Sequence, residues 1–228
     1  MRFARLSLLI VLALALTGCG RRESYRYKLT LSLETPEGVK TASRVGEISF
    51  VDAVIPARGT MTDVKGEAIL IDLGKDRRPL IALTSREIPL GTFKTWQHWG
   101  VSPTGVLARL HGDKYGKEDL IDVVRSLKTL KGAHEIPTED LPDLVTFADI
   151  NDPQSIVLVD PDDLESTLGP GIKWRSMTVE VTTEPVTTGI EQKLPWVKTY
   201  NPLIKVSGTG PTNNYERRLK GLDFKRER

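Results

Sequence analysis

The feature that most constrains the fold is an unbroken alternation of apolar and polar residues near the start of the chain. In SYRYKLTLSLE, residues 24–34, every second position is apolar: Tyr25, Tyr27, Leu29, Leu31 and Leu33. A period of two is typical of a strand with one face on a core and the other in water. Thr35-Pro36-Glu37-Gly38 is a turn sequence, and a second alternating run follows it. That run changes phase after Gly46, which predicts an antiparallel hairpin with a β-bulge at that glycine.

Further strands are predicted downstream. Ala68–Leu73 and Leu80–Leu83 are apolar runs joined by the polar residues 74–78, which favours a second hairpin. Residues 144–147 (LVTF) and the alternating run at residues 172–183, which holds Met177, Val179 and Val181, predict two more strands. The segment Arg86–Asp113 shows no sustained period, and we expect loops there with one short strand, Gly105–Leu110.

Three segments have helical signals. The stretch Lys117–Lys131 repeats apolar residues at helical spacing and is followed by Gly132. In VDPDDLESTLGPG, residues 159–171, we expect Asp160 as the N-cap and Gly169 as the stop. Thr188-Gly189-Ile190-Glu191 has the spacing of a capping box, and Pro195 would end that helix quickly. The predicted fold class is α+β, a mainly antiparallel β-sheet built from hairpins with two or three short helices.

The first twenty residues have the order of a secretory signal. Arg2 and Arg5 give a basic start, Leu6–Leu16 is apolar apart from Ser7, and small residues precede Cys19. A membrane span needs about 20 apolar residues, so the run is too short to cross comfortably. A conventional signal or an uncleaved anchor is the alternative interpretation of this segment.

The tetrapeptide Leu16-Thr17-Gly18-Cys19 resembles the lipobox of bacterial lipoproteins. This resemblance implies that the Cys19 thiol carries a diacylglyceryl group, that a peptidase cuts before Cys19, and that acyl chains hold the protein to a cell membrane. Gly20 is not the aspartate associated with retention in the inner membrane. We therefore expect attachment to the outer membrane, facing the periplasm, in preference to the inner membrane.

The predicted organisation has four parts. Residues 1–18 form the lipoprotein signal peptide, residues 19–23 the lipidated N-terminus and tether, and residues 24–207 one globular α+β domain. Residues 208–228 are polar with mixed charge, so we expect a disordered tail. The segments LPDLVTFADINDPQSIVLVDPDDLESTLGPGIKW and VTTGIEQKLPW resemble an uncharacterised group of bacterial and prophage-associated lipoproteins, a resemblance that implies no activity.

The amino-acid composition limits the classes of partner that the protein is expected to bind. Cys19 is the only cysteine, so the folded part holds no disulfide. The chain has 32 Lys and Arg against 30 Asp and Glu, a formal net charge of +2, and the surplus equals Arg2 and Arg5 of the predicted signal peptide. Nothing indicates the basic stripe of a nucleic-acid surface. We expect the lipid on Cys19 to supply the contact with the membrane.

Few residue patterns suggest chemistry. The three histidines, His98, His111 and His134, match no zinc motif, and no Gly-x-Ser-x-Gly elbow is present. An acidic group consists of Asp149, Asn151, Asp152, Asp160, Asp162 and Asp163. It could ligate calcium, but turns and helix caps favour the same residues. Trp96 and Trp99 could contact a partner protein or a peptidoglycan strand, although buried loop anchors are the alternative. We predict no catalytic residue, metal or cofactor.

These observations predict a lipid-anchored cell-envelope protein that acts as a binding or structural module, more plausibly not an enzyme. Two alternatives stay open. One is a periplasmic hydrolase with an unrecognised site, since triads are recognised by geometry and not by order in the sequence. The other is a prophage-encoded exclusion lipoprotein that blocks a receptor or entry channel.

Overall fold

The computed structural model describes residues 21–52, 60–90, 95–100, 104–110, 119–200, 202–206 and 218–227. These residues form mainly antiparallel sheets with short helices, so the predicted α+β class is confirmed. No helix in this part of the chain is long and apolar enough to cross a membrane. The predicted signal peptide and Cys19 lie outside the described residues.

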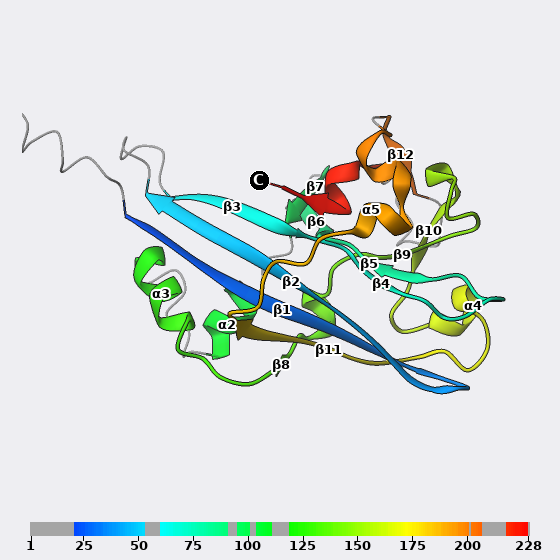
Figure 1. The fold of residues 1–228 in the computed structure, drawn as a ribbon, viewed down its shortest axis with the longest axis horizontal. Helices are drawn as coiled ribbons and strands as arrows, with labels where there is room; N and C mark the ends of the chain where they lie inside the picture. The colour runs from blue at the N-terminus through cyan, green and yellow to red at the C-terminus, as the bar shows by residue number, and fades with distance from the viewer. Residues whose placement is uncertain are drawn as a thin grey trace, which may run out of the picture.

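The largest sheet has the strand order β14-β3-β2-β1-β11-β8, with every pair antiparallel (Figure 1). Its strands are β1 (Arg22–Thr35), β2 (Gly38–Asp52), β3 (Thr60–Glu67), β8 (His134–Glu135), β11 (Lys173–Thr182) and β14 (Lys225–Arg226). Strands β1 and β2 are the longest and run diagonally across the molecule (Figure 1). They form the predicted hairpin, with Pro36 and Glu37 at its turn and Gly38 at φ +114°.

The alternation in β1 has the predicted effect. Tyr25, Tyr27, Leu29, Leu31 and Leu33 are all at most 4% exposed, and they form much of one hydrophobic core. The residues between them are at least partly accessible to solvent. Met177 and Val179 of β11 complete this core on the neighbouring strand, because they pair with Leu31 and Leu29.

The predicted bulge at Gly46 is wrong. The register of β1 and β2 is continuous from the pair Arg22 and Val51 to the pair Thr35 and Gly38. Gly46 lies directly opposite Tyr27, and a Cβ there would be 2.6 Å from the Tyr27 ring. The apparent change of phase therefore has a steric cause: the core face of β2 carries a glycine where the tyrosine ring needs space.

A second sheet has the order β10-β9-β5-β4. Strands β4 (Ile69–Ile71) and β5 (Leu80–Ala82) form the predicted second hairpin, and β9 (Leu144–Phe147) is the predicted LVTF strand. Strand β10 (Ile156–Val159) pairs with β9 and forms an edge. All four residues of β9 are buried, which fits an interior strand.

Helix α3 (Leu120–Leu127) is shorter than the predicted segment Lys117–Lys131. Asp119 caps its first turn by accepting the N–H of Ile121 at 2.9 Å. Its apolar face packs on the main sheet through four buried residues: Ile121, Val123, Val124 and Leu127. Helical spacing therefore identified the buried face correctly but overestimated the length.

Helix α4 (Leu164–Leu168) ends at Gly169 as predicted, with φ +97°, but its N-cap is Asp163. Asp160, the predicted N-cap, instead accepts the N–H of Asp162 at 2.9 Å in the preceding turn. Both aspartates accept backbone N–H groups. The sequence therefore predicted an aspartate N-cap correctly but placed it three residues too early.

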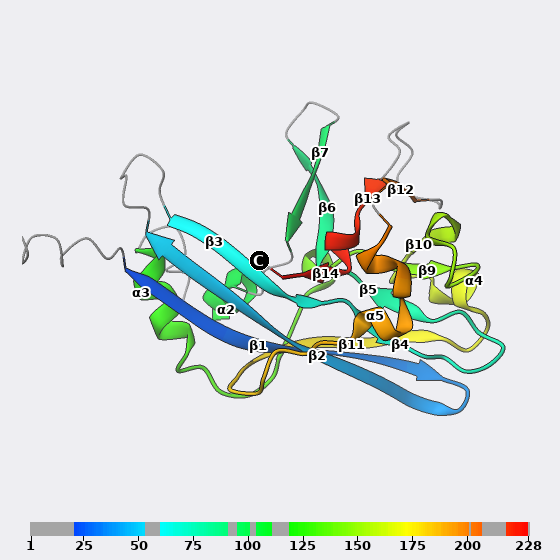
Figure 2. The same cartoon turned by 45° about the horizontal axis from the view of Figure 1, so that its top comes forward.

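The segment Arg86–Asp113 differs from the loops that we predicted. Strands β6 (Ser85–Leu90) and β7 (Thr95–Gly100) form a two-stranded hairpin that stands away from the main sheet (Figure 2). The predicted strand Gly105–Leu110 is instead helix α2 (Thr104–Leu110). Val106, Leu107 and Ala108 are all buried, and a short continuous apolar run does not distinguish a strand from a buried helix.

Helix α5 (Ile190–Lys193) is preceded by its N-cap residue, Gly189, which adopts φ +116°. The predicted capping box does not form, because neither Thr188 nor Glu191 caps this end. The cap comes from Glu67 of β3, whose carboxylate accepts the N–H groups of Gly189 (3.0 Å) and Ile190 (2.8 Å). A short 3-10 helix, η4 (Pro195–Lys198), follows directly.

The prediction of disorder is wrong for residues 218–227. Strand β13 (Arg218–Leu219) pairs with β12 (Ile204–Lys205), and η5 (Gly221–Asp223) leads into β14 beside β3. Leu219 and Phe224 are 1% and 0% exposed. Phe224 lies against Trp196, with ring centroids 5.0 Å apart, in a second hydrophobic core. Two well-placed apolar side chains therefore order a segment whose average composition is polar.

Candidate functional site

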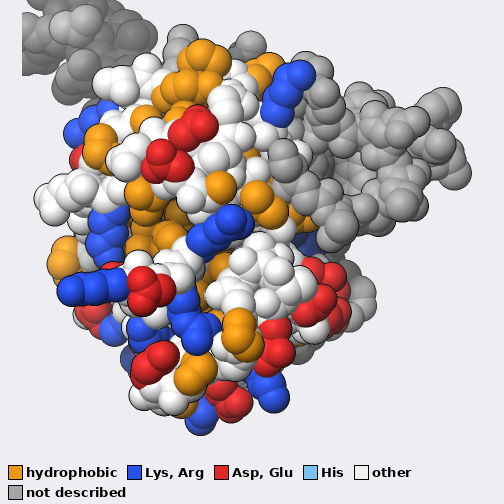
Figure 3. Space-filling model, turned by 90° about the vertical axis from the view of Figure 1, so that its right-hand side faces the viewer, with side chains coloured by type: hydrophobic (Ala, Val, Ile, Leu, Met, Phe, Trp, Pro, Cys, Tyr) orange, Lys and Arg blue, Asp and Glu red, His pale blue; other side chains and the backbone are white. Residues whose placement is uncertain are grey.

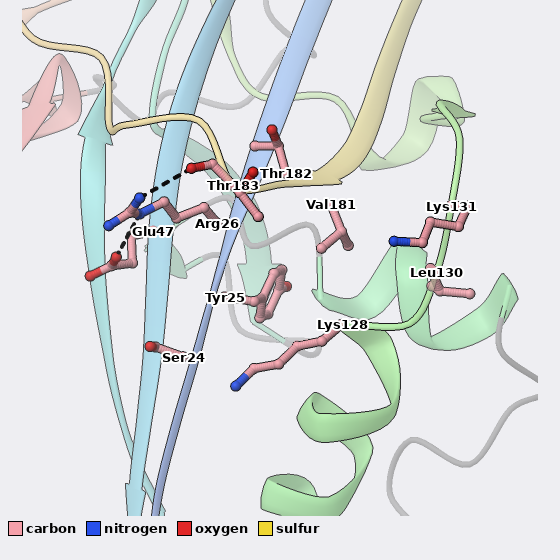
Figure 4. A pocket seen from close by; sticks show the side chains of 10 residues that line it. All are labelled: Ser24, Tyr25, Arg26, Glu47, Lys128, Leu130, Lys131, Val181, Thr182 and Thr183. Carbon is pink, nitrogen blue, oxygen red and sulfur yellow. Dashed lines mark hydrogen bonds and ion pairs between the residues drawn. The ribbon is translucent and has the colours of Figure 1, made fainter.

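A hollow of about 550 Å³ lies between the main sheet and the C-terminal end of α3 (Figure 4). We call it the edge hollow. Its lining residues are Ser24, Tyr25, Arg26, Glu47, Lys128, Leu130, Lys131, Val181, Thr182 and Thr183. Apolar groups, cations and hydroxyls from β1, β2, β11 and the end of α3 thus share one site.

The edge hollow exists because two neighbouring strands differ in length. The last pair between β1 and β11 joins Arg26 to Thr182, whereas β1 continues back to Arg22 beside β2. Among the described residues, the stretch Arg22–Tyr25 therefore has a strand on one side only.

The apolar wall consists of Tyr25, Leu130 and Val181 (Figure 4). Tyr25 is only 4% exposed, and its hydroxyl is hydrogen-bonded to Thr104 Oγ1 of α2 at 2.6 Å. This bond fixes the tyrosine ring between the sheet and the helices. The wall is therefore preformed and does not depend on a ligand.

Two of the three cations at the edge hollow are paired with carboxylates. The Arg26 Nε donates to Glu47 at 3.0 Å, and its Nη1 donates to the carbonyl oxygen of Thr183 at 3.3 Å. Lys128 forms an ion pair with Glu23, and hydrogen bonding by Lys128 lowers the pKa of that carboxyl. Most of the charge of Arg26 and Lys128 is thus compensated within the protein.

Lys131 differs from Arg26 and Lys128 in its lack of a described carboxylate partner. Its side chain extends toward the edge hollow from the segment after α3 (Figure 4), and its ammonium forms no ion pair with any described residue. The carbonyl oxygen of Lys131 lies 3.2 Å from Nε2 of His134. Among the described residues, one cation without an ion pair therefore lies beside an apolar wall, an arrangement that is suited to binding an anionic group.

A second hollow, of about 600 Å³, lies between η4 and the C-terminal segment. It is lined by Val197, Lys198, Thr199, Tyr200, Lys220, Gly221, Leu222, Lys225 and Glu227. Lys225 forms ion pairs with Glu67, Glu191 and Glu227, and Lys198 pairs with Glu191. These cations serve the docking of the C-terminal segment, so we do not regard this hollow as the primary site.

A buried polar pair lies elsewhere in the main sheet. Arg44 is 3% exposed, and its Nη1 donates to the carbonyl oxygen of Glu67, whereas its Nε has no hydrogen-bond partner among the described residues. Burial lowers the pKa of Arg44 and raises the pKa of Tyr27, whose hydroxyl is likewise unpartnered in this part of the chain. A Cβ at Gly66 would lie 3.2 Å from Arg44 Nη1, so a glycine makes room for the guanidinium.

Trp96 and Trp99, the predicted partner contacts, both lie on β7. Trp96 pairs with Pro89 of β6 and Trp99 pairs with Arg86. Both positions thus belong to one projecting hairpin (Figure 2).

The acidic group serves turns and caps. Asp149, Asp152, Asp160 and Asp163 each accept a backbone N–H two or three residues ahead. Within the described ranges no group of three or more His, Cys, Asp or Glu side chains could hold a metal ion. His134 lies on β8, His98 lies on β7, and His111 lies outside the described residues.

The edge hollow was not predicted from the sequence. Arg26 was counted only as part of the wet face of a strand, and Lys128 and Lys131 only as part of a helix. The available signal was the local density of bases after the apolar helical residues, LKTLKG at residues 127–132. That signal is weak, because the meeting of these residues with β1 depends on tertiary structure.

Comparison with known proteins returned no relative. No protein-family model matches the chain, and neither a curated protein nor a solved structure is significantly similar to it.

Proposed function

We propose that this chain is a lipid-anchored cell-envelope protein whose folded part acts as a binding or structural module. The observation that carries the proposal is the sequence Leu16-Thr17-Gly18-Cys19, with its single cysteine, directly before the fold. Strand β1 begins at Arg22, only three residues after Cys19. An acyl group on Cys19 would therefore hold the main sheet close to a bilayer, with outer-membrane attachment facing the periplasm favoured.

Confinement to a membrane surface supports a role in binding. A tethered domain meets its neighbours at a high effective concentration, so even a weak contact is occupied. The hairpin of β6 and β7 projects from the molecule and carries Trp96 and Trp99 (Figure 2). We propose that this hairpin contacts another envelope protein or peptidoglycan, since aromatic residues are frequent anchors at interfaces.

The first test concerns the anchor. Mass spectrometry of the mature wild-type protein should show an N-terminal Cys19 that carries acyl groups. Cys19→Ser should keep the signal peptide and lose the acyl mass. An unmodified Cys19 in the mature wild-type protein would contradict the anchor.

The second test concerns the contact. Crosslinking in intact cells, followed by identification of the crosslinked species, should give a product that Trp96→Ala or Trp99→Ala weakens. Met61→Ala is the matched control, because Met61 is an apolar side chain that is 54% exposed on β3, outside the hairpin. Equal crosslinking in all four proteins would exclude the hairpin as the contact.

A further inference from the structure

Strand β10 forms one edge of the second sheet, where it pairs with β9 alone. Ser155, directly before β10, accepts the N–H of Ala148, directly after β9, at 3.1 Å. In an antiparallel pair, the positions that exchange hydrogen bonds recur at every second residue. The backbone groups of Val157 therefore face β9, whereas those of Ile156 and Leu158 face away from it.

The outward backbone groups of β10 are open to a partner strand. The N–H and C=O groups of Ile156 and Leu158 form no hydrogen bond with any other described residue. Strand β10 is short, but its sequence IVLV contains no charge or proline, and its register with β9 shows no bulge, which are common means of protecting an edge. Val157 and Leu158 are half-buried, so an added strand would also cover apolar surface.

Carboxylates lie at both ends of this edge. Two aspartates precede β10 and three follow it: Asp149, Asp152, Asp160, Asp162 and Asp163. All five are exposed, and none forms an ion pair with a described residue. Strand β10 and helix α4 lie at the right-hand side of Figure 1, which is the side that faces the viewer in Figure 3. The hydrogen bonds to nearby backbone N–H groups fix four of these carboxylates in place without neutralising them.

These charges indicate which kind of strand fits. Antiparallel pairing with β10 of a second copy, with Ile156 opposite Leu158, would bring Asp152 of one copy toward Asp162 of the other. Like charges that face each other across paired strands are destabilising. A segment with basic residues at both ends would instead meet opposite charge at both ends of the edge.

We propose that the edge of β10 binds an extended segment of a partner protein as an added strand. The segment has β-branched residues at its centre and lysine or arginine at both ends. Its backbone hydrogen bonds to Ile156 and Leu158 supply affinity, and the flanking aspartates supply selectivity. This surface is separate from the β6–β7 hairpin and requires no membrane anchor, so the inference goes beyond the proposed function.

Fluorescence anisotropy with the purified full chain in detergent tests the proposal. The probe is a labelled peptide, KKVTVTVKK. A second peptide has glutamate in place of every lysine, and a third carries N-methyl groups on the five central amides. Both should bind about tenfold more weakly or worse, because one repels the aspartates and the other cannot donate central backbone hydrogen bonds. Equal binding of the N-methylated peptide would overturn the proposal, since charge alone would then explain the association.

Amide hydrogen exchange resolved by residue locates the bound peptide. Saturation with KKVTVTVKK should slow the exchange of Ile156 and Leu158 about tenfold or more, because their N–H groups become hydrogen-bonded. Val157 should change less, since its N–H already faces β9. Unchanged exchange at both Ile156 and Leu158 would place the peptide elsewhere and overturn the proposal.

A charge-reversal variant tests the flanking carboxylates. Asp162→Lys should weaken binding of KKVTVTVKK about fivefold, because it replaces attraction by repulsion at one end of the edge. Asp63→Lys on β3 is the matched control, since Asp63 likewise forms no ion pair with a described residue and lies in the main sheet. Equal affinity of the two variants would contradict the role of the aspartates and so the proposed partner. None of these results bears on the tests of Cys19 or of the β6–β7 hairpin.

Discussion

The buried carboxylate of Glu67 offers the sharpest test of how the two parts of the fold are joined. Glu67 is 3% exposed at the end of β3, and its two oxygens accept the N–H groups of Gly189 and Ile190 at 3.0 and 2.8 Å. Lys225 lies 3.4 Å from the same carboxylate. One side chain therefore connects the main sheet to α5 and to the C-terminal segment.

Replacement of Glu67 by Gln keeps the size of the side chain and removes one acceptor. An amide has a single oxygen, so its NH₂ group must face one of the two backbone N–H donors. The variant also removes the negative charge beside Lys225. Loss of one charge-assisted hydrogen bond with a buried donor left unpaired costs about 2–4 kcal/mol in the free energy of unfolding.

Urea unfolding followed by tryptophan fluorescence, with linear extrapolation to water, measures this difference. Glu184→Gln is the matched control, because the Glu184 side chain is 51% exposed and its carboxylate forms a surface ion pair with Lys28 at 2.8 Å. Exposed pairs contribute about 0–1 kcal/mol. If Glu67→Gln destabilises the protein no more than Glu184→Gln does, the carboxylate is not the cap that we describe.

Three further substitutions test separate parts of the structure. Gly46→Ala should cost about 1–3 kcal/mol of stability, because the new Cβ would lie 2.6 Å from the Tyr27 ring, and combination with Tyr27→Ala should be less than additive in a double-mutant cycle. Phe224→Ala should cost about 3–5 kcal/mol in urea unfolding, since its ring is fully buried, whereas a disordered C-terminal segment would show no change. Hydrogen bonds from its own backbone N–H and from two lysines hold the pKa of Glu191 at about 2, below its ordinary value of 4.5. This contribution to stability is therefore present above pH 4.5 and is lost as the pH falls toward 2. Glu191→Gln should flatten the pH dependence of unfolding in that range, and an unchanged profile would contradict the assignment.

The parts of the fold that the sequence predicted are those in which local pattern and burial agree. Alternation identified every core-facing residue of β1 from Tyr25 to Leu33, because a strand with one buried and one solvent-exposed face alternates apolar and polar residues in its sequence. Turn residues placed the hairpin of β1 and β2 correctly, and Gly169 ended α4 where expected. These signals require no knowledge of distant residues.

The errors share a different origin, which is contact between residues far apart in the sequence. The cap of α5 comes from Glu67, more than a hundred residues earlier, so the local capping-box pattern was misleading. We predicted a bulge at Gly46, whereas the glycine is needed there because the ring of Tyr27 on the neighbouring strand occupies the space of a side chain. The segment with Leu219 and Phe224 resembled a disordered tail because its burial depends on Trp196 and the second core. Local composition does not encode such contacts.

The candidate site was unpredictable for the same reason, and its origin indicates which part of the fold to alter. The edge hollow forms where β11 ends at Thr182 while β1 continues to Arg22, and α3 faces the exposed edge from the other side. A mismatch in strand length has no signature in either strand alone. The edge hollow thus depends on where β11 ends, so extension of β11 beyond Thr182 should close the hollow while leaving both cores intact.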